Sequence, residues 1–225
     1  TAPVPCDNAN TTYNTGPYCH AGNISLEPVN FPLTSAQITQ MEGQAANGGV
    51  TDCSAGCTIT SGNIGPRKYD GDLTISGNVT LTGTIWVKGN LTLDSTVTLS
   101  SAYGSESGTI IADDPDDLIS GGRIIVASGG NAIGNSNPDT YIMLLSMSAT
   151  TDDNNGAIDV SNNLTAGVVF AANGSVVLKN SADLKEVTGH RIVLQNNSDV
   201  TYETGLASVV FLSGPRGSCA YPRGS

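Results

Sequence analysis

Clustered aspartates offer the first candidate chemistry in this chain. Two acidic loops occur, one with four carboxylates within five residues and one with two carboxylates ahead of a glycine. Carboxylate oxygens are the ligands that Ca²⁺ prefers, so both loops are candidate calcium sites, although neither has the spacing of an EF-hand. A solvated acidic loop is the favoured interpretation of each. The residues concerned are Asp113, Asp114, Asp116, Asp117, Asp152 and Asp153.

One set of residues could support acid–base catalysis. Parallel β-helix enzymes that cleave acidic polysaccharides place aspartates beside His, Arg or Lys on one face, and here Asp183 and Asp199 stand on either side of His190 in the sequence. A lone histidine beside turn residues is more often a surface residue. The sequence has no serine-nucleophile pattern and no glycine-rich phosphate loop. We therefore expect no catalytic residues and no enzyme activity.

Trp86 is a candidate ligand or interface residue, because it alternates outward between two apolar neighbours. An exposed tryptophan can stack on a sugar or pack in an interface. The favoured interpretation is that Trp86 lies under the N-terminal segment.

Two short rows of threonine are a candidate ice-binding surface. Thr74 and Thr92 are 18 residues apart, and so are Thr80 and Thr98. The rows do not continue into later repeats. Threonine is also a common outward residue of strands, and this is the favoured interpretation.

Seven Asn-x-Ser/Thr sequences are candidate glycosylation sites. Several coincide with turn asparagines, which tolerate left-handed backbone and can hydrogen-bond to one another along a stack of strands. Turn chemistry and chance therefore explain most of them. The sites are Asn10, Asn23, Asn78, Asn90, Asn163, Asn173 and Asn196.

The five cysteines favour disulfides over a zinc site. Four lie in the first quarter of the chain and Cys219 stands alone near its end. The Asn- and Thr-rich context is typical of extracellular proteins, in which such cysteines form disulfides. We expect the pairs Cys6–Cys19 and Cys53–Cys57, with Cys219 outside both.

A repeat of about 17 residues must position all of these side chains. Each copy has an apolar strand, a polar residue and a turn residue, so no single copy can bury its own apolar face. This pattern predicts an all-β fold, a right-handed parallel β-helix (β-solenoid), over residues 58–213. Equivalent apolar residues should share one core: Ile75, Leu93, Val126, Val160, Leu178 and Leu194.

The flanking segments differ from the repeats. Residues 1–57 form an expected N-terminal arm tied by a disulfide, with a helix at residues 35–46 that covers the open end of the core. Residues 214–225 form an expected C-terminal tail. The first residue is Thr1 rather than Met, so we expect that a preceding segment has been removed.

Charge and composition exclude some partners. The formal net charge is −11, and the nine Lys and Arg residues are not clustered, so nucleic acid is not an expected partner. No apolar run reaches the length of a transmembrane helix. No cofactor is expected apart from the candidate calcium.

Several segments resemble an uncharacterised family of bacterial surface proteins that carry a prepilin-like N-terminus and a β-solenoid body. The resemblance covers residues 30–218. It implies an exported, pilin-like or pilin-associated protein and carries no catalytic motif. The segments are 30–38, 45–49, 64–66, 81–90, 103–105, 107–108, 141–146 and 202–208.

The expected function is therefore structural. We expect a non-catalytic extracellular protein at the cell surface, a pilus or filament subunit with an adhesive role, that associates with itself, with other surface subunits or with surface glycans. The alternatives are a carbohydrate-binding or polysaccharide-cleaving β-helix protein and an ice-binding solenoid.

Overall fold

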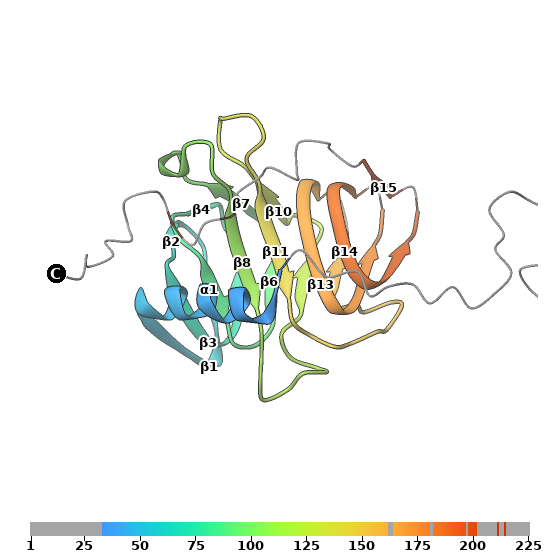
Figure 1. Cartoon of the computed structure of the whole chain (residues 1–225), viewed down its shortest axis with the longest axis horizontal. Helices are drawn as coiled ribbons and strands as arrows, with labels where there is room; N and C mark the ends of the chain where they lie inside the picture. Colours follow the sequence, from blue (N-terminus) through green and yellow to red (C-terminus); the bar gives the residue numbers. More distant parts are fainter. Residues whose placement is uncertain are drawn as a thin grey trace, which may run out of the picture. The chain divides into compact units, whose positions relative to one another are not determined.

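A computed structural model describes residues 33–161, 164–180, 182–196, 198–201, 211 and 214. The chain divides into two compact units, Thr1–Leu33 and Thr34–Ser225, and the description below concerns the second. Within it, one α-helix precedes a set of short strands (Figure 1). The helices of this part of the chain are all too short or too polar to cross a bilayer.

Helix α1 (Ser35–Asn47) lies where the sequence predicts it. Thr34 forms a capping box with Gln37: its side chain accepts from the Gln37 backbone N–H at 3.3 Å, and its own N–H donates to Gln37 Oε1 at 2.9 Å. The helix ends at Gly48, and strand β1 begins at Val50, eight residues before the predicted boundary of the strand region at residue 58.

The strands form two sheets in which all pairs are parallel. The larger sheet contains β1 (Val50–Ile59), β3 (Arg67–Ile75), β5 (Ile85–Val87), β6 (Leu91–Leu93), β8 (Gly108–Ala112), β9 (Ile124–Val126), β11 (Ile142–Ser146), β12 (Ile158–Val160), β13 (Thr165–Leu178), β14 (Asp183–Leu194) and β15 (Asp199–Val200). The smaller contains β2 (Gly62–Ile64), β4 (Val79–Leu81), β7 (Thr96–Leu99) and β10 (Asn131–Ile133).

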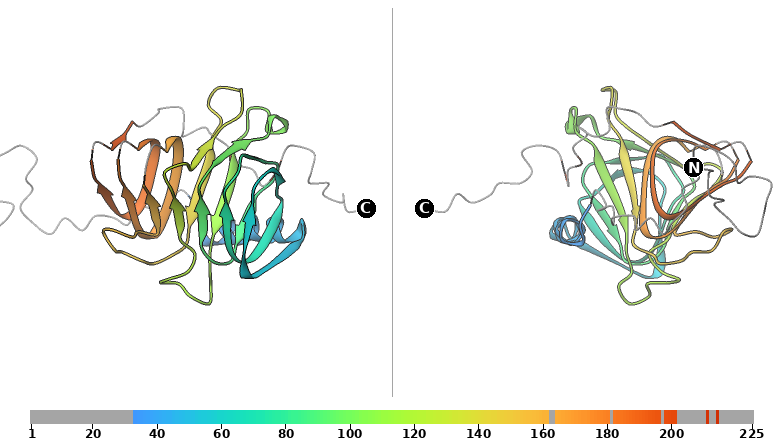
Figure 2. Two further views of the ribbon diagram at one scale, coloured as in Figure 1. Left: turned by 180° about the vertical axis from the view of Figure 1, so that it is seen from behind. Right: turned by 45° about the vertical axis from the view of Figure 1, so that its right-hand side comes forward.

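The larger sheet closes on itself, so the predicted right-handed parallel β-helix is wrong. Two long strands cause the closure. β3 pairs with β5 through its first residues and with β6 through its last, and β13 pairs in the same way with β11 and β12. The resulting ring runs β3-β5-β8-β11-β13-β12-β9-β6 and encloses one interior (Figure 2, right). The fold is a closed eight-stranded parallel barrel with a second parallel sheet and one helix.

Gly71 explains why the sequence pattern predicted the wrong sheet topology. The repeat has an apolar strand and then a turn residue in each copy, so it predicts that a strand ends at its turn residue. In β3 the chain instead passes through Gly71 with φ of 135° and stays in the sheet. A Cβ at this position would lie 2.1 Å from the Cys53 carbonyl oxygen of the neighbouring strand, so only glycine fits.

The repeat does predict the core residues well. Its equivalent positions are direct neighbours across the paired strands, in the order Ile75, Leu93, Val126, Val160, Leu178 and Leu194. The first five are fully buried. Leu194 is 53% exposed, so the prediction is wrong there. β15 pairs only with the start of β14, and no described strand lies beyond Leu194.

Helix α1 lies against the outside of β3 and β5 (Figure 1). Its buried residues, Ile38, Glu42 and Ala45, follow helical spacing and face the sheet. The prediction that this helix covers an open end of the core is therefore wrong: it covers an outer face. Apolar residues are also buried on the outer side of the ring. Ile111 of β8 and Leu145 of β11 are fully buried, although they alternate with the residues that point into the core.

The pair Leu178 and Leu194 provides a matched test of the core assignment, because the two residues face each other in register on β13 and β14. Leu178→Asp should lower the free energy of unfolding by about 4 kcal/mol, since it places an unpaired charge in the interior. Leu194→Asp should change it by less than about 0.5 kcal/mol. Urea denaturation of both variants at low protein concentration measures the difference, and equal effects would contradict the assignment.

Candidate functional site

Two carboxyl groups meet beneath helix α1. Glu42 is the helix's single charged residue and is only 8% exposed, and Asp113 follows directly after β8. Their side chains hydrogen-bond to each other. Burial, together with the hydrogen bond to Asp113 and the negative charge of Asp113, raises the pKa of Glu42 to about 8. At neutral pH, Glu42 therefore holds the shared proton and donates it to Asp113.

The environment of Asp113 differs from that of Glu42. Burial also raises the pKa of Asp113, and so does the charge of Asp114, but the hydrogen bond with Glu42 lowers it. These opposite effects of one hydrogen bond place the proton on Glu42. The second oxygen of Glu42, Oε1, is buried and has no hydrogen-bond partner among the described residues.

Trp86 connects this pair to the sheet. Its indole N–H donates to the Asp113 carbonyl oxygen at 3.0 Å, which fixes the backbone at the end of β8. The Lys68 ammonium lies 4.5 Å from the centre of the Trp86 ring, and it also pairs with Asp70 at 3.1 Å. The half-buried tryptophan is thus engaged within the protein. The prediction of Trp86 as a ligand or interface residue stays a prediction.

The first acidic loop borders a shallow depression of about 270 Å³ lined by Asp70, Gly71, Lys88, Asp114 and Asp116. Lys88 pairs with Asp116 at 2.7 Å. This contact lowers the pKa of the Asp116 carboxyl. One carboxylate of the loop is therefore neutralised by a lysine that directly follows β5.

The other carboxylates of the two acidic loops hold turns. Asp114 accepts from the Asp116 N–H at 3.1 Å, and Asp117 accepts from the Ser120 N–H at 2.8 Å. In the second loop, Asp152 accepts from two backbone N–H groups, which lower its pKa, and Asp153 pairs with Arg191 at 2.8 Å. No group of three or more His, Cys, Asp or Glu side chains in the described part of the chain is arranged to hold a metal ion. Calcium binding by these loops stays a prediction.

A second buried carboxylate, Asp159, is neutralised by a cation. Its side chain is 7% exposed, and its Oδ2 lies 2.8 Å from the Lys179 ammonium. The same ammonium donates to the Asn154 carbonyl oxygen at 2.6 Å. Lys179 follows β13, so it ties the second acidic loop and β12 to the end of β13.

The residues of the candidate catalytic set are all exposed. Asp183 and Asp199 are register neighbours on β14 and β15. His190 lies seven residues beyond Asp183 on β14, roughly 20 Å along an extended strand. The structure therefore brings the two aspartates together but not the histidine.

The threonine rows are short. Thr74 lies beside Thr92, and Thr80 beside Thr98, as the spacing predicts. The next position along the first row is Ile125. Thr58 lies beside Thr74 on the other side, so the first row has three threonines, and the second row ends at Ile133.

Asparagines stack at the turns. Asn196 donates to Asn180 Oδ1 at 3.1 Å, and both have the left-handed backbone expected of turn asparagines, with φ of 50° and 52°. Asn78 accepts from the Ser95 hydroxyl at 2.8 Å. Among the candidate glycosylation sites, Asn90 and Asn173 also make side-chain hydrogen bonds to backbone groups. Asn10, Asn23 and Asn163 lie outside the described residues.

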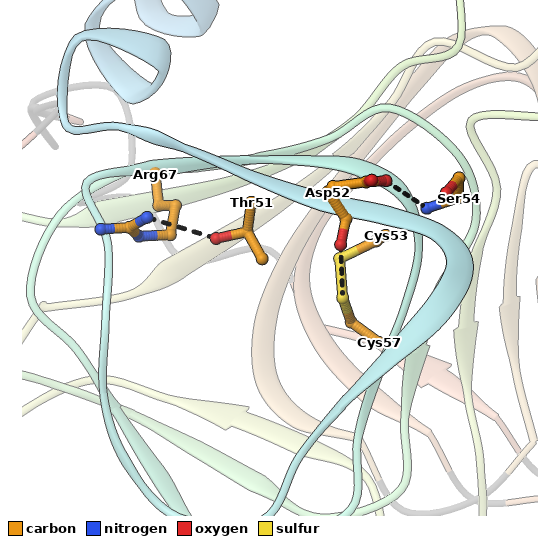
Figure 3. Close-up of a disulfide and its surroundings, with 6 residues drawn as sticks. All are labelled: Thr51, Asp52, Cys53, Ser54, Cys57 and Arg67. Carbon is orange, nitrogen blue, oxygen red and sulfur yellow. Dashed lines mark hydrogen bonds between the residues drawn. A yellow bond between two sulfur atoms is a disulfide. The ribbon is translucent and has the colours of Figure 1, made fainter.

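The predicted Cys53–Cys57 disulfide is confirmed (Figure 3). It closes a bulge in β1, beside an aspartate, Asp52, that accepts from the Ser54 N–H at 2.9 Å. Cys6, Cys19 and Cys219 lie outside the described residues, so the Cys6–Cys19 pair stays a prediction.

Comparisons with known proteins add no relative to this picture. No family model matches the chain, and neither a curated protein nor a solved structure matches it.

Sequence reasoning missed the Glu42–Asp113 pair, although two signals pointed to it. A glutamate interrupts the apolar stripe formed by Ile38 and Ala45. The apolar runs at residues 110–112 and 141–145 are continuous rather than alternating, which is typical of strands buried on both faces. Together they indicate a helix packed on the outside of the sheet with an ionisable group in the contact.

The Asp159–Lys179 pair should matter for stability, because breaking it leaves a buried carboxylate without a cation. We expect Lys179→Met to lower the free energy of unfolding by about 2–3 kcal/mol, somewhat below the range for fully buried pairs because the lysine is partly exposed. The exposed Arg191–Asp153 pair serves as the control, and Arg191→Met should cost less than about 1 kcal/mol. Urea denaturation measures both, and comparable losses would refute the distinction.

Proposed function

We propose that this protein is a non-catalytic structural subunit of an extracellular surface assembly, and that it joins the next copy through the outer edge of β14. The observation that carries the proposal is an apolar strand edge. Ile192 and Leu194 of β14 are 45% and 53% exposed, and Val200 of β15 is 40% exposed. Large exposed apolar side chains that gather on one strand edge are typical of a contact surface.

The backbone of β14 supports the same proposal. β13 pairs with β14 along its whole length, whereas β15 pairs only with Asp183 and Leu184. The outer edge of residues 186–194 therefore has no strand partner within the described part of the chain. An unpaired edge presents N–H and C=O groups that can pair with a strand of another molecule.

The second copy can supply β1, the strand at the other limit of the sheet, which pairs only with β3 in the described residues. Corner shape favours this match. Within the chain, a four-residue step in one strand twice lies beside a two-residue step in its neighbour: Cys53–Cys57 of β1 beside β3, and Ala171–Ser175 of β13 beside β14. Placing β1 of a second copy next to β14 would repeat this arrangement.

A contact between two different edges is heterologous and generates an open chain of copies rather than a closed dimer. This is the geometry that a pilus or filament subunit needs. The resemblance to pilin-like surface proteins agrees with such a role, and the Cys53–Cys57 disulfide is typical of proteins outside the cytosol.

Lysine substitutions should separate the β14 edge from other exposed apolar residues. We expect Ile192→Lys/Leu194→Lys to abolish self-association, because two charges would be buried in the strand contact. The control, Leu118→Lys/Ile119→Lys, removes a comparable apolar pair (55% and 67% exposed) from a loop and should leave association unchanged. Analytical ultracentrifugation over a concentration series, with electron microscopy of the same samples, provides the measurement.

Three outcomes would contradict the proposal. A wild-type protein that stays monomeric at high concentration and forms no filaments would show that the protein does not assemble with itself. Equal loss in both double variants would remove the role of β14. Cleavage of an acidic polysaccharide that disappears in His190→Ala would replace the structural function with a catalytic one.

A further inference from the structure

We propose that the Glu42–Asp113 carboxyl pair is a proton-controlled latch, which holds helix α1 against the outside of the sheet in acidic and neutral solution and releases it in alkaline solution. This inference does not depend on the proposed assembly, because it concerns the outer face of β3 and β5 and not the edges of β1 and β14. Its basis is the small contact through which the helix is attached.

The contact of α1 rests on three buried residues, and Glu42 lies between the other two, Ile38 and Ala45. Ala45 contributes little apolar area and Met41 is only partly buried, so Ile38 is the one large apolar side chain of the helix that is fully in the contact. Burying an ionised carboxylate without a cation opposes such a contact, whereas a neutral carboxyl that donates a hydrogen bond supports it. The protonation state of Glu42 therefore decides how strongly the helix is held.

The cations near this carboxyl pair are held by other groups, so a proton reduces the charge of the pair. Helix α1 carries no other charged residue. On the sheet, Arg67 donates to Thr51 at 3.2 Å, Lys68 is held by Asp70 and Trp86, and Lys88 is held by Asp116. Tyr69 of β3 is buried in the core, and Asp114 adds a further negative charge next to Asp113.

The direction of the pH effect follows from linkage. The pKa of Glu42 is about 8 in the folded protein against an ordinary value of 4.5, so the folded state binds this proton more tightly than the unfolded state does. The stabilisation from the pair is fully present below pH 4.5 and is lost as the pH rises through 8. Alkaline solution should thus loosen α1 first, while the closed ring remains folded.

The chain contains its own reporter for this event, because Trp86 is its only tryptophan and its indole donates to Asp113. We expect the Trp86 emission to change with a single transition near pH 8, below the range in which tyrosines ionise. Hydrogen exchange followed by mass spectrometry should show loss of protection in α1 by up to about tenfold per pH unit beyond the intrinsic rate, with β6 unaffected.

The decisive variant is Glu42→Gln, which keeps the size of the side chain and can still donate to Asp113. It should keep α1 protected and remove the transition near pH 8. Glu42→Gln/Gln40→Glu restores the charge of the helix at an exposed position and should behave like the single variant. Circular dichroism at pH 5 checks that each variant is folded.

Other results would overturn the latch. A wild-type protein without a transition between pH 6 and 9, or a transition that persists in Glu42→Gln, would show that the pair does not control α1. Restoration of the acidic spectrum at pH 9 by millimolar Ca²⁺ would identify the pair as a cation site instead. Equal loss of protection in α1 and β6 would indicate global unfolding rather than release of the helix.

Discussion

The closure of the parallel sheet through β3 and β13 is the constraint on which the rest of this structure depends. Each of these strands pairs with two different neighbours at its two ends, so the strands on either side become one ring. Closure buries one face of every ring strand, and among the described residues it leaves the open edges of this sheet on strands outside the ring, at β1, at β15 and along the part of β14 that β15 does not cover. It also creates an outer face around the ring, part of which α1 covers. The position of the free edges and the position of the helix thus have the same origin.

The protein neutralises two buried carboxylates in different ways. Asp159 meets the ammonium of Lys179 in a buried ion pair. Glu42 meets another carboxyl and keeps a proton. The first arrangement fixes a loop to the ring permanently. The second makes the attachment of α1 depend on the solution, because protons, unlike the lysine, leave when the pH rises.

Residue spacing predicted local relations better than it predicted topology. The repeat correctly places Ile75 beside Leu93 and buries both, and the threonine and asparagine neighbours also follow from it. Spacing does not show whether a strand ends at a glycine or bends through it, and this is why the passage of β3 through Gly71, and with it the closure, was not predicted.

The repeat also did not predict the exposure of its last apolar residue or the candidate site. Leu194 has the same place in the repeat as Leu178, but burial depends on a further strand that its sequence position does not supply. Cys53 and Cys57 were paired correctly because their separation is short. Glu42 and Asp113 are 71 positions apart, and only the packing of α1 on the outside of the ring brings them together.

The parallel arrangement has a consequence for how this chain reaches its native state. Paired residues on neighbouring strands are at least 16 positions apart, as for Val176 and Ile192, and up to 35 apart, as for Thr96 and Asn131. None of the described strand pairs is a hairpin, so pairing cannot begin with a local turn and spread from it. Such high contact order is associated with folding over milliseconds to seconds. During that interval the apolar strand residues of the newly made chain stay accessible to other unfolded copies and to chaperones.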